Sequence, residues 1–250
     1  MARGVGRWAA GCIGLLLAGC GGSDAPPPAG DVPDPGPQGY YTGSLVSQTS
    51  GLTISAFALV GDDGRIHIVE PGLGRQFLVS FPAADGGWHA ALTGHAGSLT
   101  DFPDGSARCT GHVDGSAFAA AELTGSYACG GDHGSFDLVY DDTVSFEPPD
   151  VGGLTGLAED DSATGDVTLL SIAPDGTFTG SDTMGCSYAG SLSAADPIIN
   201  VYAMQLHWTC AGHSVAMSGL ATLASHGGAP ALYYAVADAF HSRAGILVFQ

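Results

Sequence analysis

The sequence predicts an all-β, antiparallel protein with two similar small β-barrel or β-sandwich halves that follow a disordered tether. Three observations predict this class: short runs rich in β-branched and aromatic residues, Asp-Gly dipeptides between those runs, and two cysteine pairs that give both halves a similar plan. Helical periodicity is almost absent beyond the tether. An antiparallel meander is therefore favoured over a fold in which strands and helices alternate.

Residues 1–19 have the three-part pattern of an export signal. Arg3 and Arg7 supply a positive start, the stretch from Trp8 to Leu17 is apolar or small without charge, and small residues precede Cys20. About ten apolar residues form a helix of only ~15 Å, whereas the bilayer core is ~30 Å thick. The segment is therefore expected to be a removable signal and not a permanent membrane span.

The four residues Leu17-Ala18-Gly19-Cys20 resemble the lipobox of bacterial lipoprotein precursors. The resemblance implies that the Cys20 sulfur is diacylated, that the chain is cut before Cys20, and that the new amino group is often acylated as well. Gly21, and not Asp, follows the cysteine, which in such lipoproteins favours the outer membrane. We expect a lipid-anchored outer-membrane protein that faces the periplasm or the cell surface; an ordinary secretory signal with an incidental cysteine is the alternative.

Residues 20–38 are expected to be a lipidated tether, because prolines and glycines extend a chain that has too few apolar residues to fold. A first β domain is predicted at 39–146 and a second at 151–250. The segment Glu147-Pro148-Pro149-Asp150 between them reads as a linker, since two adjacent prolines cannot serve a central strand.

Eight runs carry a β pattern and are predicted as strands: 52–60, 65–69, 76–81, 135–140, 166–172, 199–208, 232–236 and 244–249. Asp-Gly dipeptides occur at 63–64, 85–86, 104–105, 114–115 and 175–176. They predict tight turns, because Asp tolerates a positive φ and Gly adopts it freely. The stretch 117–123 is rich in helix formers, but its counterpart in the second half is strand-like, so a strand is predicted there too.

Four cysteines remain after Cys12 leaves with the signal and Cys20 takes the lipid: Cys109, Cys129, Cys186 and Cys210. An even number in an exported chain predicts disulfides. Four cysteines allow three pairings, and the repeat selects Cys109–Cys129 and Cys186–Cys210. In each half an Asp-Gly turn precedes the earlier cysteine, and an aromatic residue lies two positions before the later one. A metal or redox site is the alternative, but the chain has no Cys-x-x-Cys motif.

Part of the second half, roughly residues 165–225, resembles glycine-rich β-lipoproteins of proteobacteria that lack an assigned function. The segments that carry the resemblance are 175–180, 185–192 and 219–223, which read DGTFTG, GCSYAGSL and GLATL. The first half departs from this pattern, because Cys109 is followed by Thr-Gly-His without the aromatic residue found at Tyr188. The rhythm of strands and turns is also similar to that of lipocalin-type and avidin-type barrels.

The chain is strongly acidic, with 25 acidic residues, no lysine and a formal net charge of −19. Four arginines lie beyond Cys20: Arg65, Arg75, Arg108 and Arg243. Such a field repels phosphate backbones, which argues against nucleic-acid binding, and it favours a cation or a basic protein ligand. The competing interpretation is that a GC-rich genome alone produces this composition.

No catalytic, metal or cofactor site is assigned from motifs. The Gly-x-Ser-x-Gly, His-Glu-x-x-His and phosphate-loop patterns are absent. The pairs His89/His95 and His207/His213 lack the further ligands that zinc needs. Acidic pairs at 62–63, 141–142 and 160–161 lack the regular calcium-loop spacing.

Nine aromatic residues either line a ligand cavity or fill the interior, and the second reading is favoured: Tyr40, Tyr41, Trp88, Tyr127, Tyr188, Tyr202, Trp208, Tyr233 and Tyr234. The leading hypothesis is a non-enzymatic lipoprotein module that binds a small molecule or a protein, or that serves envelope structure. The competing hypothesis is an envelope hydrolase that uses scattered Ser, His and Asp. A transmembrane barrel fits less well, because the strands lack sustained lipid-facing alternation.

Overall fold

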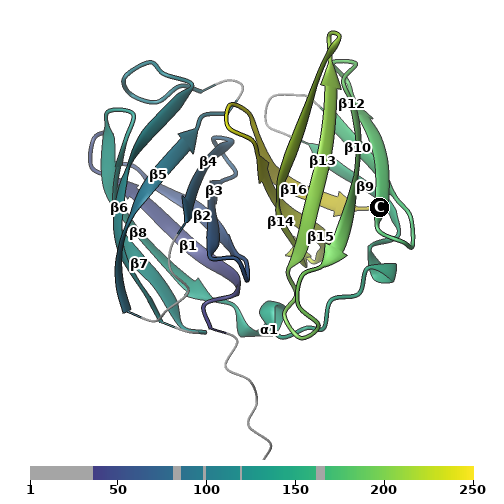
Figure 1. Ribbon diagram of the computed structural model, residues 1–250, viewed down its shortest axis with the longest axis horizontal. Helices are drawn as coiled ribbons and strands as arrows, with labels where there is room; N and C mark the ends of the chain where they lie inside the picture. Colours follow the sequence, from purple (N-terminus) through teal and green to yellow (C-terminus); the bar gives the residue numbers. More distant parts are fainter. Residues whose placement is uncertain (1–35, 81–85, 98–99, 119, 162–166) are drawn as a thin grey trace, which may run out of the picture. The chain divides into compact units, whose positions relative to one another are not determined.

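The structure of the protein is a computed structural model that describes residues 36–80, 86–97, 100–118, 120–161 and 167–250. The export signal, Cys20 and nearly all of the tether lie outside these residues. The described part consists almost entirely of antiparallel strands that close into two barrels (Figure 1). The predicted all-β class with two similar halves is confirmed. Of the two architectures expected for these halves, barrel or sandwich, both halves are barrels.

The first barrel is a meander in which each strand pairs with the next and β8 closes on β1 over seven residue pairs. Its strands are β1 (Gly39–Ser47), β2 (Thr53–Val60), β3 (Arg65–Glu70), β4 (Arg75–Ser80), β5 (Gly86–His95), β6 (Arg108–Phe118), β7 (Glu122–Cys129) and β8 (Asp132–Tyr140). Alternate side chains point inward, so Ile66 and Ile68 lie in the core while Val69 belongs to a cluster on the outer face.

The second barrel has the same meander topology but a much shorter closing seam. Its strands are β9 (Gly156–Asp161), β10 (Val167–Ile172), β11 (Thr177–Asp182), β12 (Ser187–Ala194), β13 (Tyr202–Cys210), β14 (His213–His226), β15 (Ala229–Ala237) and β16 (Ser242–Phe249). Closure rests on two pairs, Val248 with Glu159 and Phe249 with Ala158. The rest of β16 pairs with β15 on its other side.

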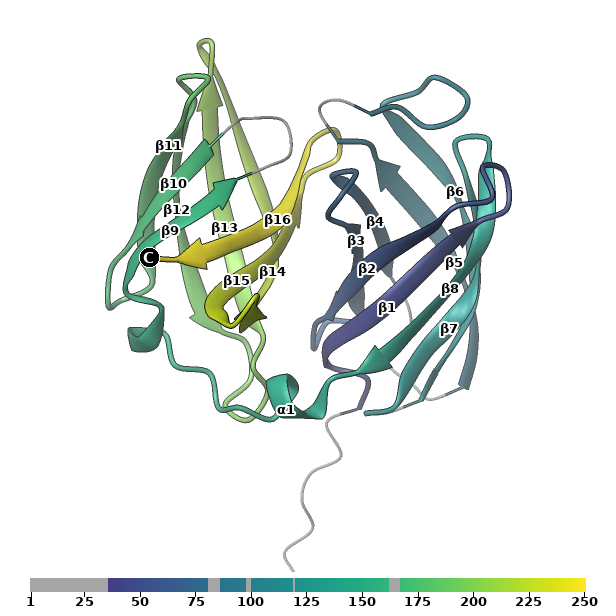
Figure 2. The ribbon, with the colours of Figure 1, turned by 180° about the vertical axis from the view of Figure 1, so that it is seen from behind.

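The segment between the barrels contains the predicted linker and two short helical turns, α1 (Asp142–Ser145) and η1 (Gly152–Leu154). Asp141 caps α1, because its carboxylate accepts a hydrogen bond from the Val144 amide at 3.0 Å. Both views show α1 near one end of the two barrels, on the path from β8 to the second barrel (Figures 1 and 2).

An apolar cluster joins the outer faces of the two barrels. From the first barrel it contains Tyr40, Phe57, Leu59 and Val69, and from the second Ile199, Val201, Leu220, Ala231, Tyr233 and Ala235. The Tyr233 ring centroid lies 5.3 Å from that of Tyr40 and 5.2 Å from that of Phe57. Strands β2 and β15 are thus buried on both faces, which explains why their sequences are continuously apolar and do not alternate.

One predicted turn lies instead inside a strand. Asp114-Gly115 belongs to β6, where Gly115 is paired with Trp88 of β5. A Cβ atom on Gly115 would lie 2.7 Å from the Trp88 ring, so this glycine makes room for an aromatic side chain. The Asp-Gly pairs ending at Gly64, Gly105 and Gly176 do have a positive φ at the glycine, and Asp85 lies outside the described residues.

The prediction of one strand over 117–123 is wrong. Strand β6 ends at Phe118, Ala120 and Ala121 form a turn, and β7 begins at Glu122. Ala120 has a φ of 48°, a conformation that local propensity does not suggest for alanine. The stretch is a hairpin because β6 and β7 pair on both sides of it.

Both predicted disulfides are present, Cys109–Cys129 and Cys186–Cys210, with Cα separations of 5.5 Å and 4.3 Å. The first joins β6 to β7, and the second joins Cys186, directly before β12, to Cys210 at the end of β13. Each bond therefore links neighbouring strands at one end of its barrel, which we call the disulfide end.

The matching cysteines occupy different places in the two meanders. They lie on the sixth and seventh strands of the first barrel but on the fourth and fifth strands of the second. The Asp-Gly turns that precede them also differ, since 104–105 lies between β5 and β6 whereas 175–176 lies between β10 and β11. The two barrels are alike in topology, but the matching cysteines are shifted by two strands and the matching turns by three.

Hydrogen bonds from the side chain of Asn200 hold α1 against the second barrel, and their contribution to stability can be tested. Its Nδ2 atom donates to the carbonyl oxygens of Val144, at 3.0 Å, and Leu223, at 2.8 Å, and the residue is 2% exposed. Asn200→Leu would keep the volume and leave both carbonyl groups without this donor. We expect the free energy of unfolding to fall by about 1–3 kcal/mol in urea titrations. Gln205→Leu, on the exposed face of β13, is the control and should change it by less than about 0.5 kcal/mol; equal effects would contradict the prediction.

Candidate ligand-binding site

The disulfide end of the first barrel is filled by Phe102, from the segment between β5 and β6. Phe102 is 2% exposed, its ring centroid lies 6.0 Å from that of Phe77, and the Arg75 Cζ atom lies 5.4 Å from its centroid. The Asp104 amide donates to the Gly130 carbonyl at 3.0 Å and holds the segment against the β7–β8 turn. The Phe102 ring therefore occupies the interior at this end.

A polar cluster lies inside the same end of the first barrel. Asp132 accepts hydrogen bonds from Ser47 Oγ at 2.7 Å and from the Tyr127 hydroxyl at 3.1 Å. The Glu70 carboxylate lies 3.7 Å from the Arg75 guanidinium. Burial, the main cause, raises the pKa of Glu70 to about 7, although Arg75 acts in the opposite direction. Glu70 is 1% exposed, so this cluster is part of the core and is closed to a substrate.

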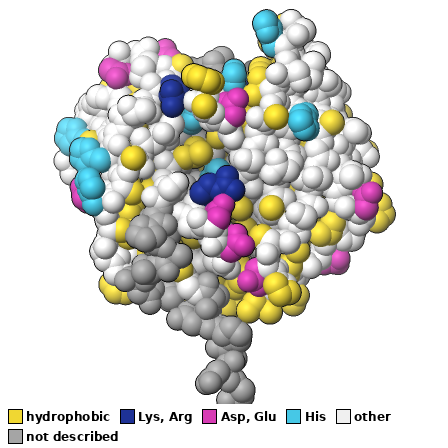
Figure 3. Space-filling model, in the orientation of Figure 1, with side chains coloured by type: hydrophobic (Ala, Val, Ile, Leu, Met, Phe, Trp, Pro, Cys, Tyr) yellow, Lys and Arg dark blue, Asp and Glu magenta, His cyan; other side chains and the backbone are white. Residues whose placement is uncertain are grey.

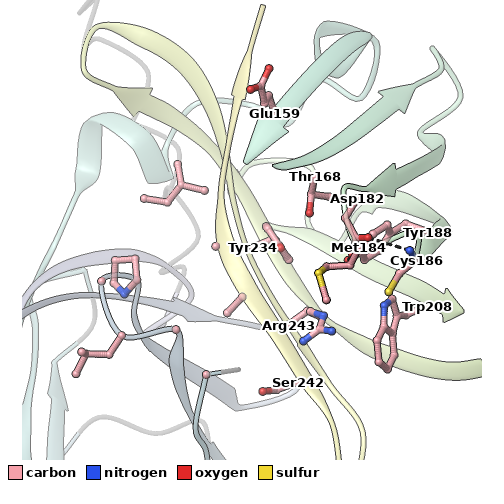
Figure 4. A pocket seen from close by; sticks show the side chains of 18 of the residues that line it. Glu159, Thr168, Asp182, Met184, Cys186, Tyr188, Trp208, Tyr234, Ser242 and Arg243 are labelled. Carbon is pink, nitrogen blue, oxygen red and sulfur yellow. Dashed lines mark hydrogen bonds between the residues drawn. The ribbon is translucent and has the colours of Figure 1, made fainter. Parts of the chain in front are cut away.

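The disulfide end of the second barrel is hollow. A cavity of about 1000 Å³ opens there, and its wall includes Thr168, Asp182, Tyr188, Trp208, Tyr234 and Arg243 (Figure 4). It continues past β16 to Ile246 and Val248 and to the turn at 71–74 of the first barrel. The short seam between β16 and β9 explains this shape, because it leaves space beside both faces of β16.

The pleat of β16 directs Arg243 into this cavity. Arg243, Gly245 and Leu247 share one face of the strand, and Leu247 is fully buried in the barrel core. Gly245 is paired with Tyr234 of β15 and places no side chain in front of it. The cavity therefore exists partly because a glycine occupies an inward position between an arginine and a core leucine.

Arg243 is half-buried, and its Cζ atom lies 4.5 Å from the centroid of the Trp208 ring. Within the described residues no Asp or Glu oxygen lies within 4.0 Å of its guanidinium. The other arginines differ: Arg65 is paired with Asp63, Arg75 lies beside Glu70, and Arg108 is exposed.

Asp182 is engaged by its own neighbours. Its Oδ1 atom accepts from the Cys186 amide at 2.8 Å and its Oδ2 atom accepts from the Tyr188 hydroxyl at 2.6 Å. Burial and this hydrogen bond raise the pKa of Tyr188 to about 12, while Arg243 acts in the opposite direction. The cavity thus presents a fixed Tyr–Asp pair and a separate guanidinium.

The nine tyrosine and tryptophan residues considered in the sequence analysis lie in four environments. Tyr41, Trp88 and Tyr127 lie in the first core, Tyr40 and Tyr233 join the barrels, and Tyr202 lies in the second core. Tyr188, Trp208 and Tyr234 line the cavity. Tyr188 and Tyr234 also belong to the second core, and Trp208 packs against it, so most of the set fills the interior as expected.

The histidine pairs noted in the sequence do not converge. His95 is 2% exposed, whereas His89, His207 and His213 lie on the surface. No group of three His, Cys, Asp or Glu side chains in the described part of the chain is placed to hold a metal ion. The acidic residues Asp63 and Asp141 bind backbone amides of their own turns, and the side chains at 160–161 are not described.

No set of Ser, His and Asp is assembled among the described hydrogen bonds. His89 bonds to Asp114 at 2.6 Å and His241 bonds to Asp238 at 3.2 Å, and neither contact continues to a serine hydroxyl. On the face shown in Figure 3, acidic side chains are scattered and cationic ones are few. Within the described segments no helix has the length and apolar character needed to cross a membrane.

Comparison with protein-family models, curated proteins and solved structures finds no match to this chain. The class of protein therefore rests on the fold and the cavity: a double β-barrel with one packed and one hollow disulfide end.

Sequence reasoning did not select Arg243 or Asp182 as site residues. One available signal was that Arg243 precedes the apolar run 244–249 in a chain with very few cations. Its inward direction depends on the strand register, which the sequence alone does not supply.

The pKa of Glu70 leads to a test of pH dependence. Because its folded-state pKa, about 7, exceeds the ordinary value of 4.5, the folded chain retains the proton and loses stability as pH rises through this interval. Glu70→Gln should raise the free energy of unfolding by on the order of 1–3 kcal/mol at pH 8 and change it little at pH 4.5. Urea titrations at both pH values measure this, with exposed Glu122→Gln as the control. An equal effect of Glu70→Gln at both pH values would contradict the raised pKa.

Proposed function

We propose that this chain is an outer-membrane lipoprotein, anchored through Cys20, whose second barrel binds a small organic molecule at its disulfide end. The observation that carries the binding role is the cavity that opens at this end, which has a volume of about 1000 Å³ together with its extension past β16 to the first barrel. The corresponding end of the first barrel is occupied by Phe102. Ligand cavities in proteins have about this size, with apolar walls and a few directed polar groups.

The wall of the cavity supports binding and offers little for catalysis. It combines the aromatic rings of Tyr188, Trp208 and Tyr234 with the guanidinium of Arg243 and the carboxylate of Asp182. Asp182 already accepts two hydrogen bonds. We therefore favour a non-enzymatic module over the envelope hydrolase that scattered Ser, His and Asp residues would form.

The lipobox and the tether support the membrane address. An anchor at Cys20 followed by proline-rich residues would hold the barrels away from the bilayer, facing the periplasm or the cell surface. Two or three acyl chains bind a membrane far more firmly than one. The acidic composition supports a role without nucleic acid.

Mass spectrometry of the protein extracted from membranes tests the anchor. The intact mass should correspond to a chain that begins at Cys20 and carries acyl groups, with four thiol protons missing for the two disulfides. Cys20→Ala should abolish both the cleavage before residue 20 and the acyl mass. Cys12→Ala is the matched control, since residue 12 leaves with the signal. An unmodified Cys20 in the natural chain would refute the anchor.

Native mass spectrometry of the same extract tests the binding role. A reproducible non-covalent adduct is expected, and it should be lost when Gly245→Leu fills the cavity opposite Tyr234. The control is Ala203→Leu, at a half-buried position of β13. Gly228→Leu would be unsuitable as a control, because Gly228 has a positive φ that a leucine would strain. An adduct that survives Gly245→Leu would place binding elsewhere.

A further inference from the structure

We infer that the ligand of this cavity is an organic carboxylate with an apolar body, whose carboxylate pairs with Arg243. This inference rests on the proposed binding function of the second barrel and adds the chemical class of the ligand. It follows from the state of Arg243, the state of Asp182 and the character of the remaining wall.

Arg243 is held in a geometry that suits a planar anion. Its Cζ atom lies 4.5 Å from the centroid of the Trp208 ring, and this cation–π contact orders the side chain at the wall of the cavity (Figure 4). In the described part of the chain no acidic side chain neutralises it. A guanidinium can bind a carboxylate through two parallel hydrogen bonds.

Asp182 does not take the place of that anion. Both of its oxygens are occupied, by the Cys186 amide and by the Tyr188 hydroxyl. The pair is therefore a fixed part of the wall. Its remaining acceptor capacity suits a polar group of the ligand near its carboxylate, such as a hydroxyl or an amide N–H.

The charge of the cavity favours one carboxylate over a phosphate. Among the described residues of the wall Arg243 is the one arginine, and Asp182 and Glu159 also line the cavity. A ligand with a single negative charge can be matched by one guanidinium, whereas a doubly charged phosphate would leave one charge unpaired in a cavity that also holds the Asp182 carboxylate.

The part of the wall beside Arg243 is suited to an apolar body. Tyr188, Trp208 and Tyr234 line the cavity on the barrel side of β16, the side that Arg243 also faces. Met184, at the rim, is 71% exposed, which is unusual for a residue of its type. An alkyl or aryl group that covers these side chains would be stabilised by their removal from water.

The acidic net charge of the chain affects the rate at which a carboxylate associates more than the strength of its pairing with Arg243. Repulsion between an anion and distant surface carboxylates is screened within about 8 Å at physiological salt. The half-buried contact with Arg243 is screened less. Added salt should therefore speed association of a carboxylate with this protein, which is the opposite of its usual effect on ligands that are steered by complementary charge.

Calorimetric titration with three matched eight-carbon probes tests the inference: octanoate, 1-octanol and octylammonium. The protein is the whole chain from residue 20 onward with Cys20→Ser, so that no acyl group competes for the cavity. We expect octanoate to bind about tenfold or more tightly than 1-octanol, and octylammonium to bind most weakly.

Variants of Arg243 and Arg108 supply the test and its control. Arg243→Gln should weaken octanoate binding about tenfold to a hundredfold and leave 1-octanol unaffected, and Arg243→Lys should weaken octanoate less. Arg108→Gln removes an exposed cation that also lies over an aromatic ring, 5.7 Å from the Phe240 centroid, and should change nothing. Circular dichroism of each variant confirms that the barrels are folded.

The outcomes separate the two proposals. Equal binding of octanoate and 1-octanol, insensitive to Arg243→Gln, would overturn the carboxylate inference and leave the binding function intact. Preferred binding of octylammonium would overturn it as well and would show that the carboxylates of the wall dominate. Failure of all three probes to bind, together with no adduct in the native protein, would refute the binding function itself.

Discussion

Closure of each meander by backbone hydrogen bonds is the constraint on which the rest of this structure depends. Once a sheet of eight strands closes, its interior has a fixed width that is just sufficient for side chains from opposite strands to meet. Each inward position must then be either filled or left empty. In the first barrel Phe102 fills the disulfide end, while in the second Gly245 leaves space there. A difference of a few side chains thus decides whether a barrel is a solid core or a receptor.

The contact between the barrels adds a second constraint. Because β2 and β15 are buried on both faces, they cannot be rotated or shifted in register without exposing apolar side chains. Strand β16 is paired along most of its length with β15, and this pairing is sufficient to fix its position. A short seam between β16 and β9 is therefore tolerated, and the short seam leaves the cavity beside β16.

The charged groups of the two barrels differ in whether a ligand can reach them. Glu70 and Arg75 lie together in a closed core, where burial raises the pKa of Glu70 and leaves the carboxyl inaccessible. Arg243 has the opposite arrangement, because it is ordered by an aromatic ring, reaches a cavity and has no acidic partner among the described residues. An ion pair in a core stabilises itself at best weakly, whereas an unpaired cation in a cavity favours an anionic ligand.

The sequence by itself determined the all-β class, the approximate positions of four strands in each half and both disulfides, because these depend on local alternation, turn chemistry and cysteine number. It did not determine that Asp114-Gly115 lies inside a strand, since the reason is the Trp88 ring on the neighbouring strand. It also did not determine that the matching cysteines occupy different strands of the two meanders. The cavity and the direction of Arg243 were decided by the tertiary structure alone, because strand register sets which alternate side chains share an interior, and register depends on contacts between residues that are distant in the sequence.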